Sequence, residues 1–264
     1  MINKKQIFLI LTIIAFLFSG CSTQKAEVKE LEQSKDTLYQ ISTLNALMEG
    51  NFQGTEKIAS LKEKGDFGIG TFHSLDGELV MSEGKVYQVN SQGKVNEMDD
   101  NITVPFAAVT WFEKDSIENL SGISNYAELT KALDEMRSSN ELFYAYKIDG
   151  KFSYIKTRSV PPQEQPYPLL SEVTKNQPIF EYENVEGSLV GFWCPDYVGQ
   201  VNVPGYHLHF LSADKTMGGH LIEVTMEEGT AFADLTAEFE MQLPETIISS
   251  DLADPEKEIA KVEK

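Results

Sequence analysis

Three of the four histidines lie close together in the sequence, at His207, His209 and His220, and the fourth is His73. The first two form an H-x-H pair in YHLHFL, an alternating run typical of a β-strand, whose residues i and i+2 project from one face. Turn-forming residues in SADKTMGG follow, so His220 would return on the neighbouring antiparallel strand. Three imidazoles that converge in this way leave coordination positions open, as a catalytic metal site does. The alternative is an H-x-H pair on an exposed strand that is unrelated to His220.

Arginine is also rare, since Arg137 and Arg158 are the only two among 22 basic residues. Arg158 ends a predicted strand in KTRSVP. A planar guanidinium binds carboxylates through two parallel hydrogen bonds, which a lysine cannot do. Arg158 is therefore a candidate for binding an anionic substrate. Arg137 falls late in the predicted helix NYAELTKALDEMRSSN, where a cation near the C-terminus is favourable, and we expect it at the surface.

The composition excludes one class of partner. The chain carries 41 Asp and Glu against 22 Lys and Arg, a net charge of −19. A surface of this sign repels phosphates, so no nucleic acid is expected as a partner. Cys21 and Cys194 are the only cysteines and form no C-x-x-C pattern, so we expect Cys194 to fill the core rather than to react.

The N-terminal residues have the features of a targeting segment. Two lysines precede an apolar run at residues 7–18, which is too short to span a bilayer permanently. The run closes on LFSGC, which resembles the lipobox of bacterial lipoproteins. We therefore expect a lipoprotein signal peptide at 1–20, a lipid on Cys21 and a flexible tether at 21–37. The protein would then be extracytoplasmic and anchored to the membrane by that lipid, or secreted if Cys21 is not lipidated.

The remaining chain predicts an α+β fold of two β-rich lobes with mixed sheets and flanking helices. An N-terminal α/β domain is expected at 38–160. Within it, LFYAYKIDGKFSYIKTR alternates on both sides of Asp149 and Gly150, which predicts a hairpin. The prolines of SVPPQEQPYP mark a boundary. A C-terminal, metal-binding, β-rich domain with a closing tail helix is expected at 161–264.

Several segments in colinear order over about residues 38–264 resemble bacterial α-acetolactate decarboxylases. They include FGIGTFHSLDGELVM, KIDGKFSYIKTRSVPPQEQPYP, NQPIFEYENVEGSLVGF, YVGQVNVPGYHLHFLSADKTMGGH and EIAKVE. The resemblance implies conversion of 2-acetolactate, a small anionic 2-hydroxy-3-keto acid, to acetoin and carbon dioxide. It also implies two α/β domains with a metal site between them, and a homodimer formed through the N-terminal sheet.

The resemblance further assigns site residues. It implies a Zn²⁺ ion held by His207, His209 and His220. Three more residues match the family's other active-site positions, namely Thr71, Glu78 and Arg158. A family glutamate also reaches in from the C-terminal tail; Glu263 is the better match, and Glu258 remains open.

The chemistry that such a site must perform can be stated from the reaction. Loss of carbon dioxide from a β-keto acid leaves an enolate, which is an enediolate here because the substrate carries a 2-hydroxyl group. A divalent metal stabilises its charge as a Lewis acid. Arg158 could hold the substrate carboxylate or the developing oxyanion. A carboxylic acid such as Glu78 or the tail glutamate would deliver a proton to one face of the carbon. The sequence does not decide which carboxyl group is the donor.

Two other functions remain as alternatives. A cupin-like metal oxygenase also uses H-x-H and a later histidine, but it expects a glutamate and a proline between them, and FLSADKTMGG contains neither. An extracytoplasmic lipoprotein that captures metal would need the histidines. It would not need Arg158 or Glu78.

Overall fold

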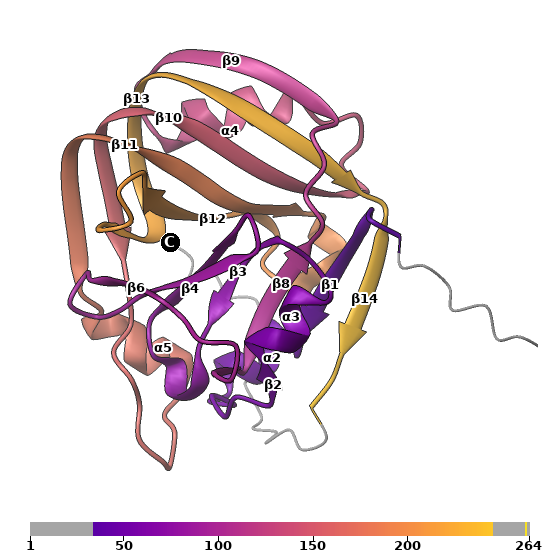
Figure 1. Ribbon diagram of the computed structural model, residues 1–264, viewed down its shortest axis with the longest axis vertical. Helices are drawn as coiled ribbons and strands as arrows, with labels where there is room; N and C mark the ends of the chain where they lie inside the picture. Colours follow the sequence, from indigo (N-terminus) through magenta and orange to yellow (C-terminus); the bar gives the residue numbers. More distant parts are fainter. Residues whose placement is uncertain (1–33, 245–261, 263–264) are drawn as a thin grey trace, which may run out of the picture. The chain divides into compact units, whose positions relative to one another are not determined.

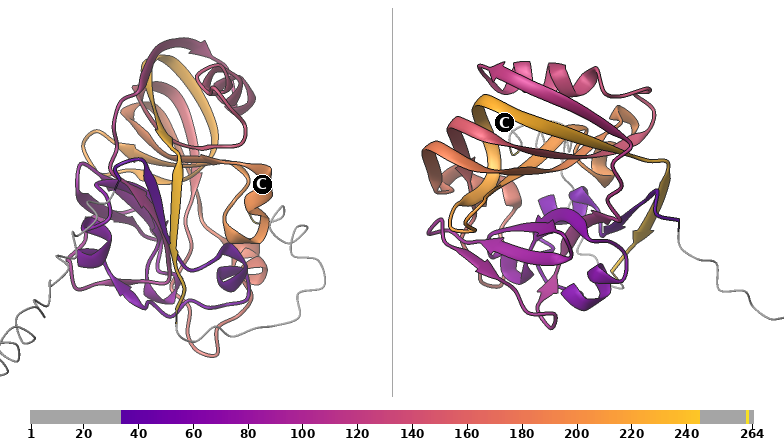
Figure 2. Two further views of the ribbon diagram at one scale, coloured as in Figure 1. Left: turned by 90° about the vertical axis from the view of Figure 1, so that its right-hand side faces the viewer. Right: turned by 45° about the horizontal axis from the view of Figure 1, so that its top comes forward.

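The computed structural model describes residues 34–244 and residue 262 of the 264-residue chain, and two β-sheets make up most of this part. The sheets lie one above the other, with strands of the second arching over the first (Figures 1 and 2). Helices lie on the outer sides of both sheets (Figure 1). The predicted α+β arrangement of two β-rich lobes with flanking helices is confirmed.

The first sheet has seven strands in the order β14-β1-β8-β3-β4-β5-β6. It is mixed, because β1 and β14 are parallel while the other neighbours are antiparallel. Its strands are β1 (Thr37–Ile41), β3 (Phe67–Thr71), β4 (Glu78–Ser82), β5 (Lys85–Val89), β6 (Val95–Glu97), β8 (Phe106–Thr110) and β14 (Glu238–Gln242). A separate two-stranded ribbon pairs β2 (Glu56–Lys57) with β7 (Thr103–Val104).

The second sheet has five antiparallel strands in the order β10-β11-β12-β13-β9. Because β10 pairs with β13 as well as with β11, four of the strands form a closed ring. The strands are β9 (Ser116–Ile123), β10 (Phe143–Arg158), β11 (Ile179–Cys194), β12 (Gly205–Ser212) and β13 (Gly218–Thr236). This ring brings the C-terminal end of β10 against the start of β13, which is where the histidines lie.

Alternating apolar residues on the strands bury a core between the two sheets. This core combines residues of both, such as Ile69 and Val80 from the first sheet with Phe192 and Leu211 from the second. Cys194 is a free cysteine that is buried in this core, and burial raises the pKa of its thiol. This agrees with the expectation that Cys194 fills the core rather than reacts.

The helices cover the outer faces and one end of the sheets. Short helices are α2 (Leu44–Met48), α3 (Ile58–Lys62) and α5 (Leu170–Val173), with 3₁₀ turns η2 (His73–Leu75), η3 (Thr174–Asn176) and η4 (Asp196–Val201). The longest helix of the described residues is α4 (Tyr126–Asp134), and Asn125 caps it by accepting from the backbone N–H of Glu128 at 2.9 Å. Leu129 and Leu133 of α4 pack onto the second sheet.

The predicted hairpin at Asp149 and Gly150 is wrong. Both residues lie inside β10, a single strand of 16 residues. Gly150 is in register with Gly187 of β11 and with Gly229 of β13, so glycines of three adjacent strands meet at one point. A Cβ atom on Gly150 would lie 2.9 Å from the carbonyl oxygen of Glu228. The glycine is therefore required by close strand packing rather than by a turn.

The boundary expected at residue 160 does not coincide with the division between the sheets. Strands β9 and β10 precede it but belong to the second sheet, while β14 follows it and joins the first. Pairing between strands that are far apart in the sequence decides to which sheet each strand belongs. A proline-rich loop gives no information about this pairing. In addition, Thr37, which we expected in the tether, is buried and begins β1.

Other expectations lie outside the described residues. These are the signal peptide, the tether before residue 34, and the closing tail helix apart from Val262. Within the described part, no helix combines the length and the apolar character that crossing a membrane requires.

Candidate metal centre and substrate cavity

His207, His209 and His220 converge as predicted. The first two lie on β12 and share a face, and His220 on β13 is in register directly opposite His209. One ring nitrogen from each of the three lies within 4.8 Å of the others. The Nε2 atoms of His207 and His209 are 3.1 Å apart. The alternative of an H-x-H pair on an exposed strand, unrelated to His220, is excluded because His209 and His220 are buried and His207 is only partly exposed.

The turn between β12 and β13 fixes this register. Ser212 ends β12, and its hydroxyl oxygen accepts from the backbone N–H groups of Thr216 and Met217 at 3.1 and 2.9 Å. Gly219 then adopts a φ of +131°, and a Cβ atom there would lie 2.6 Å from the carbonyl oxygen of Arg158. A glycine at this position therefore lets β13 pass close to β10 immediately before His220.

The donor set fits a divalent cation. Nδ1 of His209 is 2.9 Å from the carbonyl oxygen of Leu79, to which it donates, so its Nε2 carries the lone pair. Burial, and then the positive charge of Arg158, lower the pKa of His220 well below its usual value, and the same two causes lower that of His207. Neutral imidazoles are the form that binds metals. Three such nitrogens suit zinc and related transition metals.

Arg158 lies beside the three histidines. It is 5% exposed, and its register partners are His220 on β13 and Ile179 on β11. Its Nη2 donates to Nε2 of His220 at 2.9 Å. Arg158 is thus buried next to the candidate metal ligands, and its expected role in binding an anion stays a prediction.

Thr71 and Glu78 enter from the first sheet, where they are register partners at the end of β3 and the start of β4. The Glu78 side chain is 12% exposed, and its Oε2 is 3.6 Å from Nε2 of His209. The Thr71 hydroxyl donates to the carbonyl oxygen of Gly77 at 2.8 Å. The two sheets thus supply different groups, with imidazoles and guanidinium from one and a carboxylate and hydroxyl from the other.

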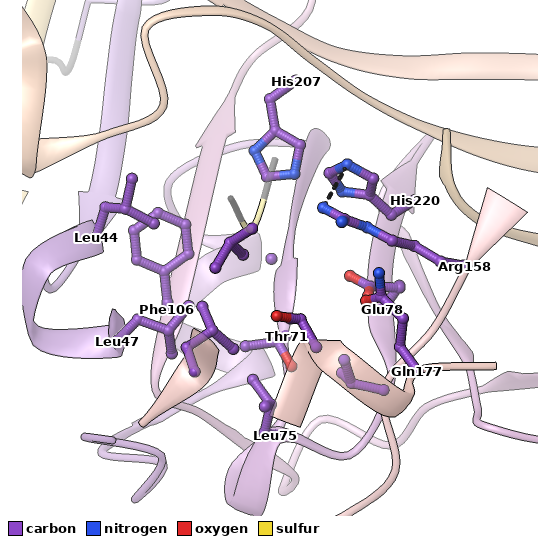
Figure 3. A pocket seen from close by; sticks show the side chains of 15 residues that line it. Leu44, Leu47, Thr71, Leu75, Glu78, Phe106, Arg158, Gln177, His207 and His220 are labelled. Atoms are coloured by element: carbon purple, nitrogen blue, oxygen red, sulfur yellow. Dashed lines mark hydrogen bonds between the residues drawn. The ribbon is translucent and has the colours of Figure 1, made fainter. Parts of the chain in front are cut away.

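These residues surround a cavity of about 60 Å³. Figure 3 shows His207, His220, Arg158 and Glu78 along one part of its wall and apolar side chains along the rest. The apolar wall consists of Leu44, Leu47, Leu75, Phe106, Val160, Leu170 and Val262. A small space with a polar and an apolar side suits a short branched-chain anion.

The C-terminal tail reaches this cavity at Val262, which is 3% exposed and packs with residues of α2 and α5. Glu263 and Glu258, the two candidates for the tail glutamate, lie outside the described residues. His73 does not join the other histidines. It lies in the η2 turn, where its Nδ1 accepts from the backbone N–H of Gly54.

Two features of the site were not predicted. Gln177 lines the cavity from the segment that follows η3, and Leu75 lines it with a left-handed φ of 59°. The motif NQP contained a signal for the first, because proline restricts the preceding residue to extended backbone and so fixes where its side chain starts. No pattern around Leu75 indicates its conformation.

The expectation that Arg137 lies at the surface is wrong. Its side chain is only 7% exposed, and the guanidinium lies over the rings of Trp193 and Tyr206, 4.0 and 5.3 Å from their centroids. It also pairs with Asp134 and donates to the Tyr206 hydroxyl. The aromatic residues come from β11 and β12, which the helix pattern could not reveal.

Comparison with known proteins agrees with this geometry. The family model described as Alpha-acetolactate decarboxylase matches residues 38–249. An alpha-acetolactate decarboxylase of Methanosarcina mazei is 48% identical over 211 residues, covering 80% of this chain and 73% of that protein. One of Brevibacillus brevis is 44% identical and covers 80% and 74%. The crystal structure of alpha-acetolactate decarboxylase from Bacillus subtilis strain 168 superposes with a TM-score of 0.83 at 35% identity, covering 86% of this chain and 99% of that one.

Proposed function

The chain belongs to the alpha-acetolactate decarboxylase family and is a carboxy-lyase, and on this premise we propose that it is a zinc enzyme that forms acetoin and carbon dioxide. His207, His209 and His220 would hold the Zn²⁺ ion. One observation carries the proposal: three imidazoles converge, and two of them, His207 and His220, line a cavity together with the buried Arg158 and the carboxylate of Glu78. When bound, the metal would supply a Lewis acid that stabilises the enediolate charge left by decarboxylation.

Arg158 is proposed to bind the carboxylate of 2-acetolactate. In the structure, Nη2 of Arg158 donates to Nε2 of His220. The lone pair of that nitrogen is the one that His220 would offer to a metal ion. Metal binding by His220 would replace this hydrogen bond, so that Nη2 of Arg158 could donate to the substrate instead. Since the protein carries a net charge of −19, attraction of an anion must come from such local groups, within a Debye length of about 8–10 Å.

Glu78 is proposed to manage the proton that replaces carbon dioxide on the substrate carbon. Its carboxylate lines the cavity and lies 3.6 Å from the imidazole of His209. Glu263 is proposed as a second carboxyl group at the same cavity, supported by the position of Val262, the residue before it. Thr71 is proposed to hold the turn before Glu78 through its bond to Gly77.

The direct test is to mix the purified protein with racemic 2-acetolactate and to follow acetoin and bound zinc. We expect turnover that is lost after chelation and restored by Zn²⁺. Turnover that persists in a protein stripped of all metal would contradict the zinc proposal. A protein that binds zinc but forms no acetoin would favour metal capture instead, and Glu78→Gln tests this further, because metal capture does not need that carboxylate.

We also propose that the protein acts outside the cytoplasm, held to the membrane by a lipid on Cys21. The support is the LFSGC sequence after the apolar run at residues 7–18. Fractionation of cells that produce the wild type or Cys21→Ser tests it. We expect the wild type with the membranes and the variant without a lipid in the soluble fraction.

A homodimer is proposed on the resemblance to the family. Sedimentation equilibrium of the chain without residues 1–20 measures its mass directly. A mass that corresponds to one chain at micromolar concentration would contradict the proposal.

A further inference from the structure

Gln177 places a buried hydrogen-bond acceptor at the wall of the catalytic cavity. Its side chain lines the cavity together with Arg158, Glu78, His207 and His220 (Figure 3). Its Oε1 atom is buried and has no hydrogen-bond partner among the residues that the structure describes. A buried carbonyl oxygen without a donor is costly, so its presence in a binding cavity points to a donor on the ligand.

The backbone fixes Gln177 relative to Arg158. Pro178 follows it and restricts it to extended backbone, with φ −66° and ψ 138°. The carbonyl oxygen of Pro178 accepts from the backbone N–H of Ser159 at 3.2 Å, and Ile179 is the register partner of Arg158. Gln177 is therefore attached to the same strand pair that positions the arginine.

Three hydrogen-bond donors of the site bond to groups other than Gln177. The Thr71 hydroxyl donates to Gly77, Nδ1 of His209 donates to Leu79, and Nη2 of Arg158 donates to His220. Glu78, when ionised, has no donor to offer. A ligand that carries a donor would supply the hydrogen bond that Oε1 of Gln177 lacks among the described residues.

We propose that Oε1 of Gln177 accepts a hydrogen bond from the tertiary hydroxyl group of the substrate, an inference that rests on the proposed function. A 2-hydroxy-3-keto acid at neutral pH has one donor, the hydroxyl O–H, and its carboxylate and ketone only accept. Gln177 thus selects 2-hydroxy acids over acids that lack the hydroxyl. Because the hydroxyl remains when carbon dioxide leaves, the bond exists before and after the reaction and acts mainly on affinity.

The test uses a pair of stable acids that differ only in this group, 2-hydroxy-2-methylpropanoate and 2-methylpropanoate. Calorimetry measures the binding of each acid to the zinc-loaded protein and to Gln177→Met, which keeps the length of the side chain but removes the amide. We expect the preference of the wild type for the hydroxy acid to fall by roughly tenfold, the effect of one hydrogen bond. Affinity for the acid without the hydroxyl should stay within about twofold.

Gln163→Met is the matched control. Gln163 lies in the nearby proline-rich segment, donates from its own amide to Pro161 and does not line the cavity. It should leave the affinities for both acids unchanged. Gln177→Asn, which shortens the side chain, serves as a second variant and should lose the preference as Gln177→Met does. Zinc content and thermal unfolding confirm that each variant is folded.

Two results would overturn the assignment to the hydroxyl. Equal loss for both acids would mean that the amide contacts the shared carboxylate, through Nε2, and an unchanged preference would mean that it contacts neither group. Turnover of 2-acetolactate by the same wild-type preparation separates the two proposals. An inactive wild type contradicts the proposed function, whereas an active wild type with an unchanged preference in Gln177→Met contradicts only the role of Gln177. In the active case, Gln177→Met should raise KM more than it lowers kcat.

Discussion

The two arginines of the chain both have side chains that are largely shielded from solvent, in two regions that use the same cation differently. Arg158 is 5% exposed and lies in the catalytic cavity beside His220. Arg137 has a side chain that is 7% exposed and lies between aromatic rings outside that cavity, with Asp134 as its counter-ion. In the first region the guanidinium donates to an imidazole of the metal site, and in the second it pairs with a carboxylate and lies over ring faces.

This difference separates a binding role from a structural one. A guanidinium that already has a carboxylate and stacks on rings holds its own elements together, here α4 against β11 and β12. A guanidinium that lines a cavity, next to a metal-binding imidazole, is placed to meet an anion. The rarity of arginine predicted a role for Arg158 alone, with Arg137 expected at the surface, so only the structural surroundings reveal that both cations have a role.

The largest effect should come from removing an imidazole of the metal site. His209→Ala deletes a buried candidate ligand, so bound zinc should fall to background. Acetoin formation should fall by more than about 100-fold, which exceeds the loss typical when a residue that only hydrogen-bonds to a metal ligand is replaced. Metal analysis and the acetoin assay measure both. His73→Ala is the control, because His73 lies in the η2 turn away from the other three histidines. Retention of stoichiometric zinc by His209→Ala would refute its role as ligand.

Replacement of Arg158 should rank second. Arg158→Lys keeps the charge but loses the planar pair of donors, so we expect kcat/KM to fall by about 100-fold with zinc content unchanged. Steady-state kinetics on metal-saturated protein measure it. Near-normal turnover would show that a point charge suffices at this position.

Replacement of Arg137 should affect stability rather than catalysis. Arg137→Lys loses the stacking on Trp193 and Tyr206, so the free energy of unfolding should fall by about 1–2 kcal/mol. Denaturant unfolding gives the difference, and the activity per folded molecule should remain close to that of the wild type. If kcat/KM instead fell as far as in Arg158→Lys, the two regions would not be distinct.

The smallest effect should appear in the pH at which zinc is lost. Burial and the charge of Arg158 lower the pKa values of the metal-binding histidines below 6.5, so protons compete for the imidazoles only at lower pH. Zinc should therefore stay bound as the pH falls through 6.5. Arg158→Gln removes a positive charge, which raises these pKa values, and the pH of half-loss should move up by less than about one unit. Arg137→Gln should leave the pH of half-loss unchanged. Dialysis at a series of pH values followed by metal analysis compares the two variants with the wild type.

Much of the metal site could be predicted because its signal is local. The H-x-H spacing places His207 and His209 on one face, and a short turn returns His220 opposite them. Thr71 and Glu78 are likewise neighbours through the pairing of β3 with β4. These relations depend on strand alternation and turn length, which sequence spacing expresses directly.

The features that were missed depend on contacts across long sequence distances. Gly150 follows Asp149 as in a hairpin turn, yet it meets Gly187 and Gly229 of other strands. Arg137 is buried by rings of residues more than 50 positions away. No periodic pattern in the sequence indicates the register of remote strands. None indicates that Oε1 of Gln177 lacks a hydrogen-bond partner among the described residues.

The parallel pairing of β14 with β1 has a consequence for how the protein is made. Thr37 of the first strand lies beside Glu238, and Ile41 beside Gln242, so the first sheet is complete only when the ribosome has passed residue 242. Until then one edge of β1 has no partner strand, and the nascent chain cannot complete the seven-stranded sheet. Final closure of this sheet must therefore follow synthesis of nearly the whole polypeptide, which leaves the earlier part open to handling by chaperones while it is still growing.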